Sequence, residues 1–110
     1  ELQNGASHAA AWGYVTADPA MRQWHLLVFD LEPPRQDRKY QVWLAKGEGE
    51  ATQWLSAGEL RVSADGSGKL KVSMPEDDAE IRALTITDEP ALGADQPTGK
   101  VLLAARLKKP

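Results

Sequence analysis

The chain has 110 residues, and its 13 basic and 16 acidic side chains give a formal net charge of −3. With 42% hydrophobic and 26% charged residues, the composition is that of one globular domain and excludes an intrinsically disordered chain. No apolar run approaches the roughly 20 residues that span a bilayer, no cysteine offers a disulfide or thiolate, and no dense Lys/Arg cluster offers a nucleic-acid footprint.

Seven segments have the alternation or the β-branched composition of strands. They are residues 12–17, 24–31, 40–45, 59–63, 69–74, 81–87 and 100–107. The clearest is 69–74, where Leu70, Val72 and Met74 share one face and polar residues share the other. Segment 24–31 is apolar on both faces, which predicts a central strand that is covered on both sides.

A turn is expected between segments 59–63 and 69–74. Asp65 and Gly66 lie in the middle of the intervening residues, and both tolerate a positive φ. The sequence therefore predicts a β-hairpin in which these two segments are the paired strands.

Helices play little part in the expected fold. The best helical candidates are residues 19–23 and 75–80, which are short and begin with proline. The elements together predict an all-β domain, an immunoglobulin-like antiparallel β-sandwich of about seven strands. We expect one domain over residues 1–110, with an ordered core at about residues 10–107.

Candidate metal and catalytic residues are sparse. His8 and His25 lie far apart in sequence, with no third ligand at metal spacing nearby. An acidic run after Pro75 offers oxygen ligands but lacks the alternating spacing and glycine of a calcium loop: Glu76, Asp77, Asp78 and Glu80. No nucleophile-elbow pattern occurs. We therefore expect no catalytic residues, no metal and no cofactor, and hence no enzyme.

Four tryptophans are many for a chain of this length. Trp24 and Trp43 lie among apolar neighbours, so we expect both in the core, with Trp43 packed between the two sheets. Trp54 follows a glycine-rich loop and is the best candidate for an exposed contact. Trp54 with Trp12 would give the alternative function, a non-catalytic extracellular module that binds glycan or peptidoglycan.

Several different short motifs follow one another along the chain in a defined order. The most specific are the string YQVWL at residues 40–44 and the pairing of Glu89–Pro90 with a later Pro-Thr-Gly. The motif residues are Tyr40, Trp43, Gly58, Asp65, Gly66, Glu89, Pro90, Gly93, Pro97, Thr98 and Gly99. Over about residues 10–107, this pattern resembles the C-terminal domain of anti-sigma-K factors. It departs from the family pattern at Glu32, Ala91 and Leu92.

The resemblance implies a single-pass membrane protein in which this domain is extracytoplasmic. A separate N-terminal cytoplasmic domain would bind an extracytoplasmic-function sigma factor, and a membrane protease would cut near the N-terminus of this chain. The motif residues themselves are expected to keep the fold. Tyr40 and Trp43 should point to opposite faces of one strand, while Gly58 and Gly66 permit turns.

Overall fold

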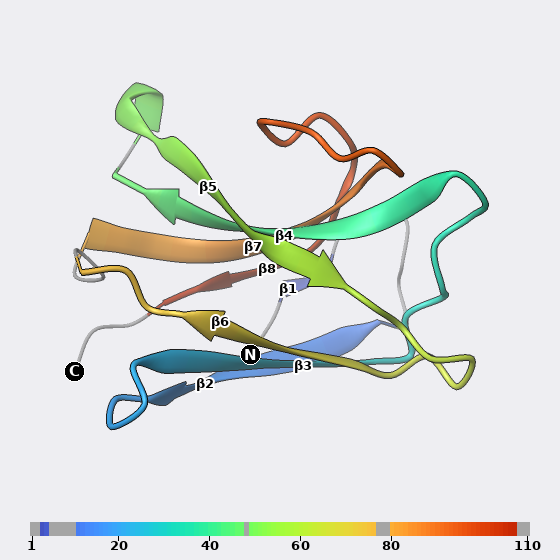
Figure 1. The fold of residues 1–110 in the computed structure, drawn as a ribbon, viewed down its shortest axis with the longest axis horizontal. Helices are drawn as coiled ribbons and strands as arrows, with labels where there is room; N and C mark the ends of the chain where they lie inside the picture. The colour runs from blue at the N-terminus through green and yellow to red at the C-terminus, as the bar shows by residue number, and fades with distance from the viewer. Residues whose placement is uncertain (1–2, 5–10, 48, 77–79, 108–110) are drawn as a thin grey trace.

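The computed structural model describes residues 3–4, 11–47, 49–76 and 80–107. Nearly all regular structure in these residues is β-strand (Figure 1). The strands are β1 (Gln3–Asn4), β2 (Trp12–Asp18), β3 (Gln23–Phe29), β4 (Arg38–Lys46), β5 (Gln53–Leu60), β6 (Gly68–Ser73), β7 (Ile81–Pro90) and β8 (Val101–Arg106), and one short 3-10 helix, η1, spans Gly49–Ala51.

The strands form two antiparallel sheets that face each other (Figure 1). One sheet has five strands in the order β1-β8-β7-β4-β5, and the other has three in the order β2-β3-β6. Without the two-residue β1, seven strands remain, divided between two sheets as in immunoglobulin-like sandwiches. The expected all-β sandwich is therefore confirmed.

The core lies between the inner faces of the two sheets. Alternate residues of each strand point into it, as the period of two requires. From β3 it receives Trp24, Leu26 and Val28, and from the facing β4 it receives Val42 and Leu44. Further buried members come from the other strands and connections: Leu31, Tyr40, Leu60, Val72, Ile81, Leu84, Ile86, Leu102, Leu103 and Ala105.

Strand β5 begins and ends earlier than the strand that the sequence predicts at this place. A strand was expected at residues 59–63, but β5 ends at Leu60, and beyond it only Val62 makes an isolated bridge, to Gly68. Most of β5 is exposed at a sheet edge, and a β-bulge shifts its pairing with β4. Apolar and polar residues do not alternate along such an edge strand, so its sequence does not predict a strand.

The predicted turn forms, but it joins two sheets rather than two paired strands. Ser63 N donates to Ser67 O at 2.8 Å, Asp65 accepts a hydrogen bond from Ser67 N, and Gly66 has a φ of +88°. Strand β5 before the turn belongs to the five-stranded sheet, and β6 after it belongs to the three-stranded sheet. The turn thus carries the chain across the sandwich.

Strand β3 is central in its sheet, and the described residues cover it on one face only. The strand ends at Phe29, because Asp30 has a φ of +56° and turns the chain away. Its residues alternate between buried and partly exposed, with His25 and Leu27 on the outward face. The expectation of cover on both sides is wrong, because the described chain packs only against the inner face of this sheet.

The helical candidate at 19–23 is a turn, and in the candidate at 75–80 only Glu80 has a helical (3-10) conformation among the described residues. Residues 19–23 contain a tight turn between β2 and β3, with Arg22 at a φ of +55°. In 75–80, Glu76 lies in a turn and residues 77–79 are outside the described residues, as is much of the acidic run. In the described part of the chain, no helix has the length and apolarity needed to cross a membrane.

Candidate functional site

A buried polar cluster lies on the outer face of the five-stranded sheet. In β4, Val42 and Leu44 point to the core between the sheets, so Trp43 points the other way. Its side chain is nevertheless completely buried. The expectation that Trp43 packs between the sheets is wrong, because the connection after β7 folds back over β4 on the side away from β3 and β6 (Figure 1).

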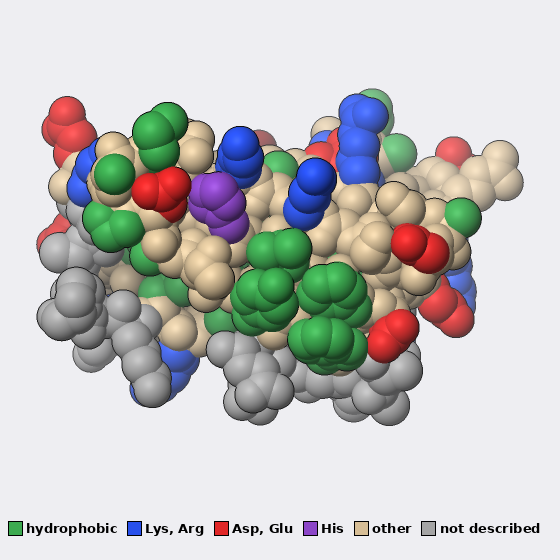
Figure 2. All heavy atoms as spheres, turned by 90° about the horizontal axis from the view of Figure 1, so that it is seen from below, with side chains coloured by type: hydrophobic (Ala, Val, Ile, Leu, Met, Phe, Trp, Pro, Cys, Tyr) green, Lys and Arg blue, Asp and Glu red, His purple; other side chains and the backbone are tan. Residues whose placement is uncertain are grey.

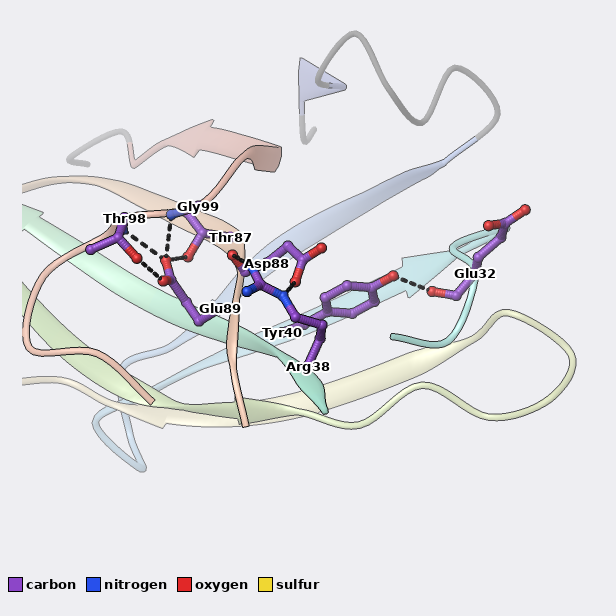
Figure 3. Close-up of polar contacts among 8 residues, drawn as sticks. All are labelled: Glu32, Arg38, Tyr40, Thr87, Asp88, Glu89, Thr98 and Gly99. Carbon is purple, nitrogen blue, oxygen red and sulfur yellow. Dashed lines mark hydrogen bonds and ion pairs between the residues drawn. The ribbon is translucent and has the colours of Figure 1, made fainter. Parts of the chain in front are cut away.

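Glu89 is the centre of this cluster and is 0% exposed. It accepts hydrogen bonds from the Thr87 hydroxyl at 2.6 Å, the Thr98 hydroxyl at 2.5 Å, Thr98 N at 3.0 Å and Gly99 N at 3.2 Å (Figure 3). Trp43 Nε1 in turn donates to Thr87 Oγ1 at 2.8 Å. We call these five residues the Glu89 network. It ties the end of the β7–β8 connection to the sheet.

The protonation state of Glu89 follows from two opposed effects. Burial alone would raise the pKa of its carboxyl group, but the hydrogen bonds from Thr87, Thr98 and Gly99 outweigh burial and lower the pKa below its ordinary value. The group is therefore a carboxylate at neutral pH. With four donors around its two oxygens, it acts as an anchor rather than a base that takes up protons.

The rest of the β7–β8 connection is held by backbone geometry and by Gln41. Gly93 has a φ of +87°, and its N–H donates to Pro90 O at 2.8 Å in a turn. Gln41 accepts from Ala94 N at 3.3 Å and donates to Ala94 O at 3.2 Å. A Cβ at Gly99 would lie 1.6 Å from Asp88 O, so only glycine allows this close approach.

The other motif residues lie in separate places. Tyr40 points into the core, opposite Trp43, and its hydroxyl donates to Glu32 O at 2.5 Å. Burial, with the nearby Asp88 and Glu32 charges, raises the pKa of Tyr40.

The remaining motif residues lie at turns and irregularities of the backbone. Gly58 has a φ of +125° beside the bulge in β5. Asp65 and Gly66 form the turn described above, and half-buried Pro97 precedes Thr98.

A polar pocket of about 660 Å³ opens beside the Glu89 network at one end of the sandwich. Arg38 Nε donates to Asp88 Oδ1 at 2.8 Å within it (Figure 3). The side chains of Arg35 and Lys100 have no hydrogen-bond or ion-pair partner among the described residues. The lining residues are Glu32, Pro33, Arg35, Arg38, Tyr40, Asp88, Thr98, Gly99, Lys100 and Leu102.

The sequence did not predict the parts that Thr87, Arg38 and Gln41 play. Thr87 and Glu89 alternate on one face of β7, and that spacing was the available signal for a shared polar cluster. Nothing local marks Arg38 or Gln41, because their partners Asp88 and Ala94 are distant in sequence. The described residues contain no group of three His, Cys, Asp or Glu side chains placed to hold a metal ion.

The exposed tryptophans do not form one surface. Trp54 is 37% exposed and pairs with Ala45, which puts it on the outer face of the five-stranded sheet. Trp12 is 46% exposed and lies in β2 of the other sheet, where it stacks on Phe29 with ring centroids 4.6 Å apart. The two indoles therefore point away from opposite sides of the sandwich. A binding surface that uses both is not supported by this geometry.

A known protein family matches this chain over most of its length. The family model described as "Anti-sigma-K factor rskA, C-terminal" matches residues 1–101, which covers all of the Glu89 network. Neither the comparison with curated proteins nor that with solved structures finds a significant match. The matched length, together with the two-sheet fold, places the chain: it belongs to the family of anti-sigma-K factor C-terminal domains.

Proposed function

We propose that this chain is the extracytoplasmic regulatory domain of a membrane-bound anti-sigma factor. A different, cytoplasmic part of the full-length protein would bind the sigma factor, an extracytoplasmic-function type. Regulated proteolysis near the N-terminal side of this domain would then release the sigma factor. The observation that carries the proposal is the family match over residues 1–101.

The geometry of the motif residues supports a regulatory role over a chemical one. The Glu89 carboxylate is surrounded by donors from its own chain and is shielded from solvent. A general base or nucleophile needs a lone pair or proton that a substrate can reach. The network instead fixes the β7–β8 connection on the sheet, which gives the domain a defined shape that other proteins can recognise.

Regulation would act through the arrangement of this domain. A ligand, partner or stress that stabilises one arrangement more than another shifts the population between them, and only by that difference in affinity. In one arrangement the protease would reach the segment that precedes this domain, and in the other it would not. The polar pocket beside the Glu89 network is lined by the 32–40 segment and by residues at the start of β8. A ligand in this pocket would therefore contact both segments and could change how they are arranged relative to each other.

Domain replacement in cells tests this function. In the full-length protein, residues 1–110 are deleted or exchanged for an unrelated β-sandwich, and cleavage fragments, sigma-dependent transcription and sigma binding are each measured. We expect altered cleavage and sigma activity, with sigma binding by the cytoplasmic part retained. Direct binding of the sigma factor by residues 1–110, or unchanged cleavage under every stress applied, would contradict the proposal.

A point variant gives a finer test. Glu89→Ala breaks the network, whereas Glu50→Ala removes an exposed glutamate in η1 and serves as the matched control. We expect Glu89→Ala to change cleavage in the full-length protein and Glu50→Ala to leave it unchanged. Equal cleavage for both variants and the parent would mean that the shape of the β7–β8 connection is not used in regulation.

A further inference from the structure

The outward face of the three-stranded sheet carries an apolar cluster that the core does not use. The register pairs Trp12 with Phe29 and Tyr14 with Leu27 across β2 and β3. These four side chains, which we call the aromatic face, lie outside the core cluster. Figure 2 shows hydrophobic side chains gathered into one patch on this side of the molecule. A contiguous apolar patch of this kind typically marks a binding surface.

The rings of the aromatic face support one another. Phe29 stacks on Trp12 at 4.6 Å and on Tyr14 at 6.2 Å between ring centroids. Trp12 Nε1 also donates to Asp30 Oδ2 at 3.2 Å, which orients the indole. The cluster is therefore ordered before it meets a partner. Because Phe29 faces both other rings, less ring face is left for a sugar to stack on than an open platform would offer.

Basic side chains border the aromatic face on β6. Lys69 pairs with Leu27 and Lys71 with His25 in the sheet register, so both lysines share the outward face. Neither lysine has a hydrogen-bond or ion-pair partner among the described residues. Two hollows of about 550 and 460 Å³ adjoin Lys69, and Arg61 lines the second. This cationic edge is local, because the whole chain has a net charge of −3.

We propose that the aromatic face and its two lysines bind the surface of a lipid bilayer that contains acidic phospholipids. Trp and Tyr side chains favour the headgroup region of membranes, and Lys side chains beside them are attracted to anionic lipid. A second copy of this chain would bring the same lysines into the interface, where like charges oppose association. The choice of a bilayer over an acidic protein rests on the proposed function, which tethers the domain beside a membrane.

Vesicle binding by residues 1–110 tests the proposal. The domain is sedimented with vesicles of phosphatidylcholine alone and of phosphatidylcholine with phosphatidylglycerol at equal amounts, at low and at physiological salt. We expect binding to the acidic vesicles only, weakened by salt. Bromine-labelled lipid should quench tryptophan emission in the parent and quench it less in Trp12→Ala.

Paired variants assign the binding to this face. Lys69→Gln with Lys71→Gln should weaken binding roughly 30-fold, since each lysine contributes about fivefold near an acidic surface. The matched control, Arg82→Gln with Arg106→Gln, removes two exposed charges elsewhere and should bind as the parent does. Trp12→Ala should weaken binding roughly tenfold, and its control is Trp54→Ala. Thermal melting of each variant checks that the fold is kept.

Four results would overturn the proposal. They are an absence of binding to acidic vesicles, equal losses in the test and control variants, sedimentation with insoluble peptidoglycan but not with vesicles, and a dimer in solution that Trp12→Ala abolishes. None of these results bears on whether deletion of the domain alters cleavage in cells. The bilayer proposal and the proposed regulatory function therefore fail separately.

Discussion

The two outward faces of the sandwich differ in how far their aromatic residues are buried. On the five-stranded sheet, the β7–β8 connection covers the part of the outer face that carries Trp43, which is fully buried, and Glu89 is hydrogen-bonded to the connection. On the three-stranded sheet, Trp12 and Tyr14 remain open to solvent. Both outward faces carry tryptophan, Trp43 and Trp54 on the five-stranded sheet and Trp12 on the three-stranded sheet. The difference shows that an aromatic residue on an outward face becomes core only where the chain returns to cover it.

The largest expected effect tests the covered face. Trp43→Ala removes a fully buried indole and leaves Thr87 Oγ1 without one of its hydrogen-bond partners. We expect a loss of roughly 3–5 kcal/mol in the free energy of unfolding, enough to unfold a small domain almost completely. Urea unfolding followed by circular dichroism measures this. The control Trp54→Ala, at an exposed site, should lose less than about 1 kcal/mol, and equal losses would refute a covered face.

Gly99→Ala tests the closeness of the connection to the sheet. The added methyl carbon would lie 1.6 Å from Asp88 O, so the backbone must move and the hydrogen bonds from Thr98 and Gly99 to Glu89 are strained. We expect a loss of about 3 kcal/mol in the free energy of unfolding and faster amide exchange in residues 91–100.

The control for this variant is Gly49→Ala. Gly49 has a positive φ of +57°, which Gly99 does not have, and an added Cβ there meets nothing within 4 Å. It should lose only about 1 kcal/mol, the cost of the left-handed backbone, with exchange in residues 91–100 unchanged. Equal losses at the two glycines would contradict a close approach of Gly99 to Asp88 O, because only that contact separates Gly99 from an ordinary position.

The Glu89 carboxylate gives the covered face a pH dependence. Its pKa is lower in the folded than in the unfolded chain, so its stabilisation is present above the unfolded pKa of about 4.3 and is lost as pH falls through the folded value. Glu89→Gln should lose about 2 kcal/mol at pH 7. The difference from the parent should shrink as pH falls below about 4. A difference that is constant from pH 7 to pH 3 would contradict the charged anchor.

The sequence predicted the strands of the sandwich better than their environment. Segment 69–74 was assigned correctly because its apolar residues alternate over its whole length, as in β6. Strand β5 was misplaced because a bulged, exposed edge loses that alternation. The face on which Trp43 lies was wrong for a different reason. Its cover comes from residues 91–100, and local periodicity contains no information about a segment so far along the chain.

The candidate site was predicted in part. Glu89, Thr98 and Gly99 were singled out by their motif, and the structure brings all three into one network. Their contacts with Thr87 and Trp43 are set by the register of β4 against β7, which pairs Trp43 with Thr85. Register depends on turns and packing throughout the sheet, so no single stretch of sequence specifies it.

The smallest expected effects test the open face. Trp12 lies on an edge strand, is 46% exposed and contacts mainly Phe29, so Trp12→Ala should lose about 0.5–1 kcal/mol in the free energy of unfolding, the value of one cross-strand aromatic pair. Lys71→Ala, in the same sheet, should lose less than about 0.5 kcal/mol. Both are measured by urea unfolding beside Trp43→Ala. A loss for Trp12→Ala as large as that for Trp43→Ala would mean that the outward face of the three-stranded sheet is also core, and the contrast between the two faces would then be lost.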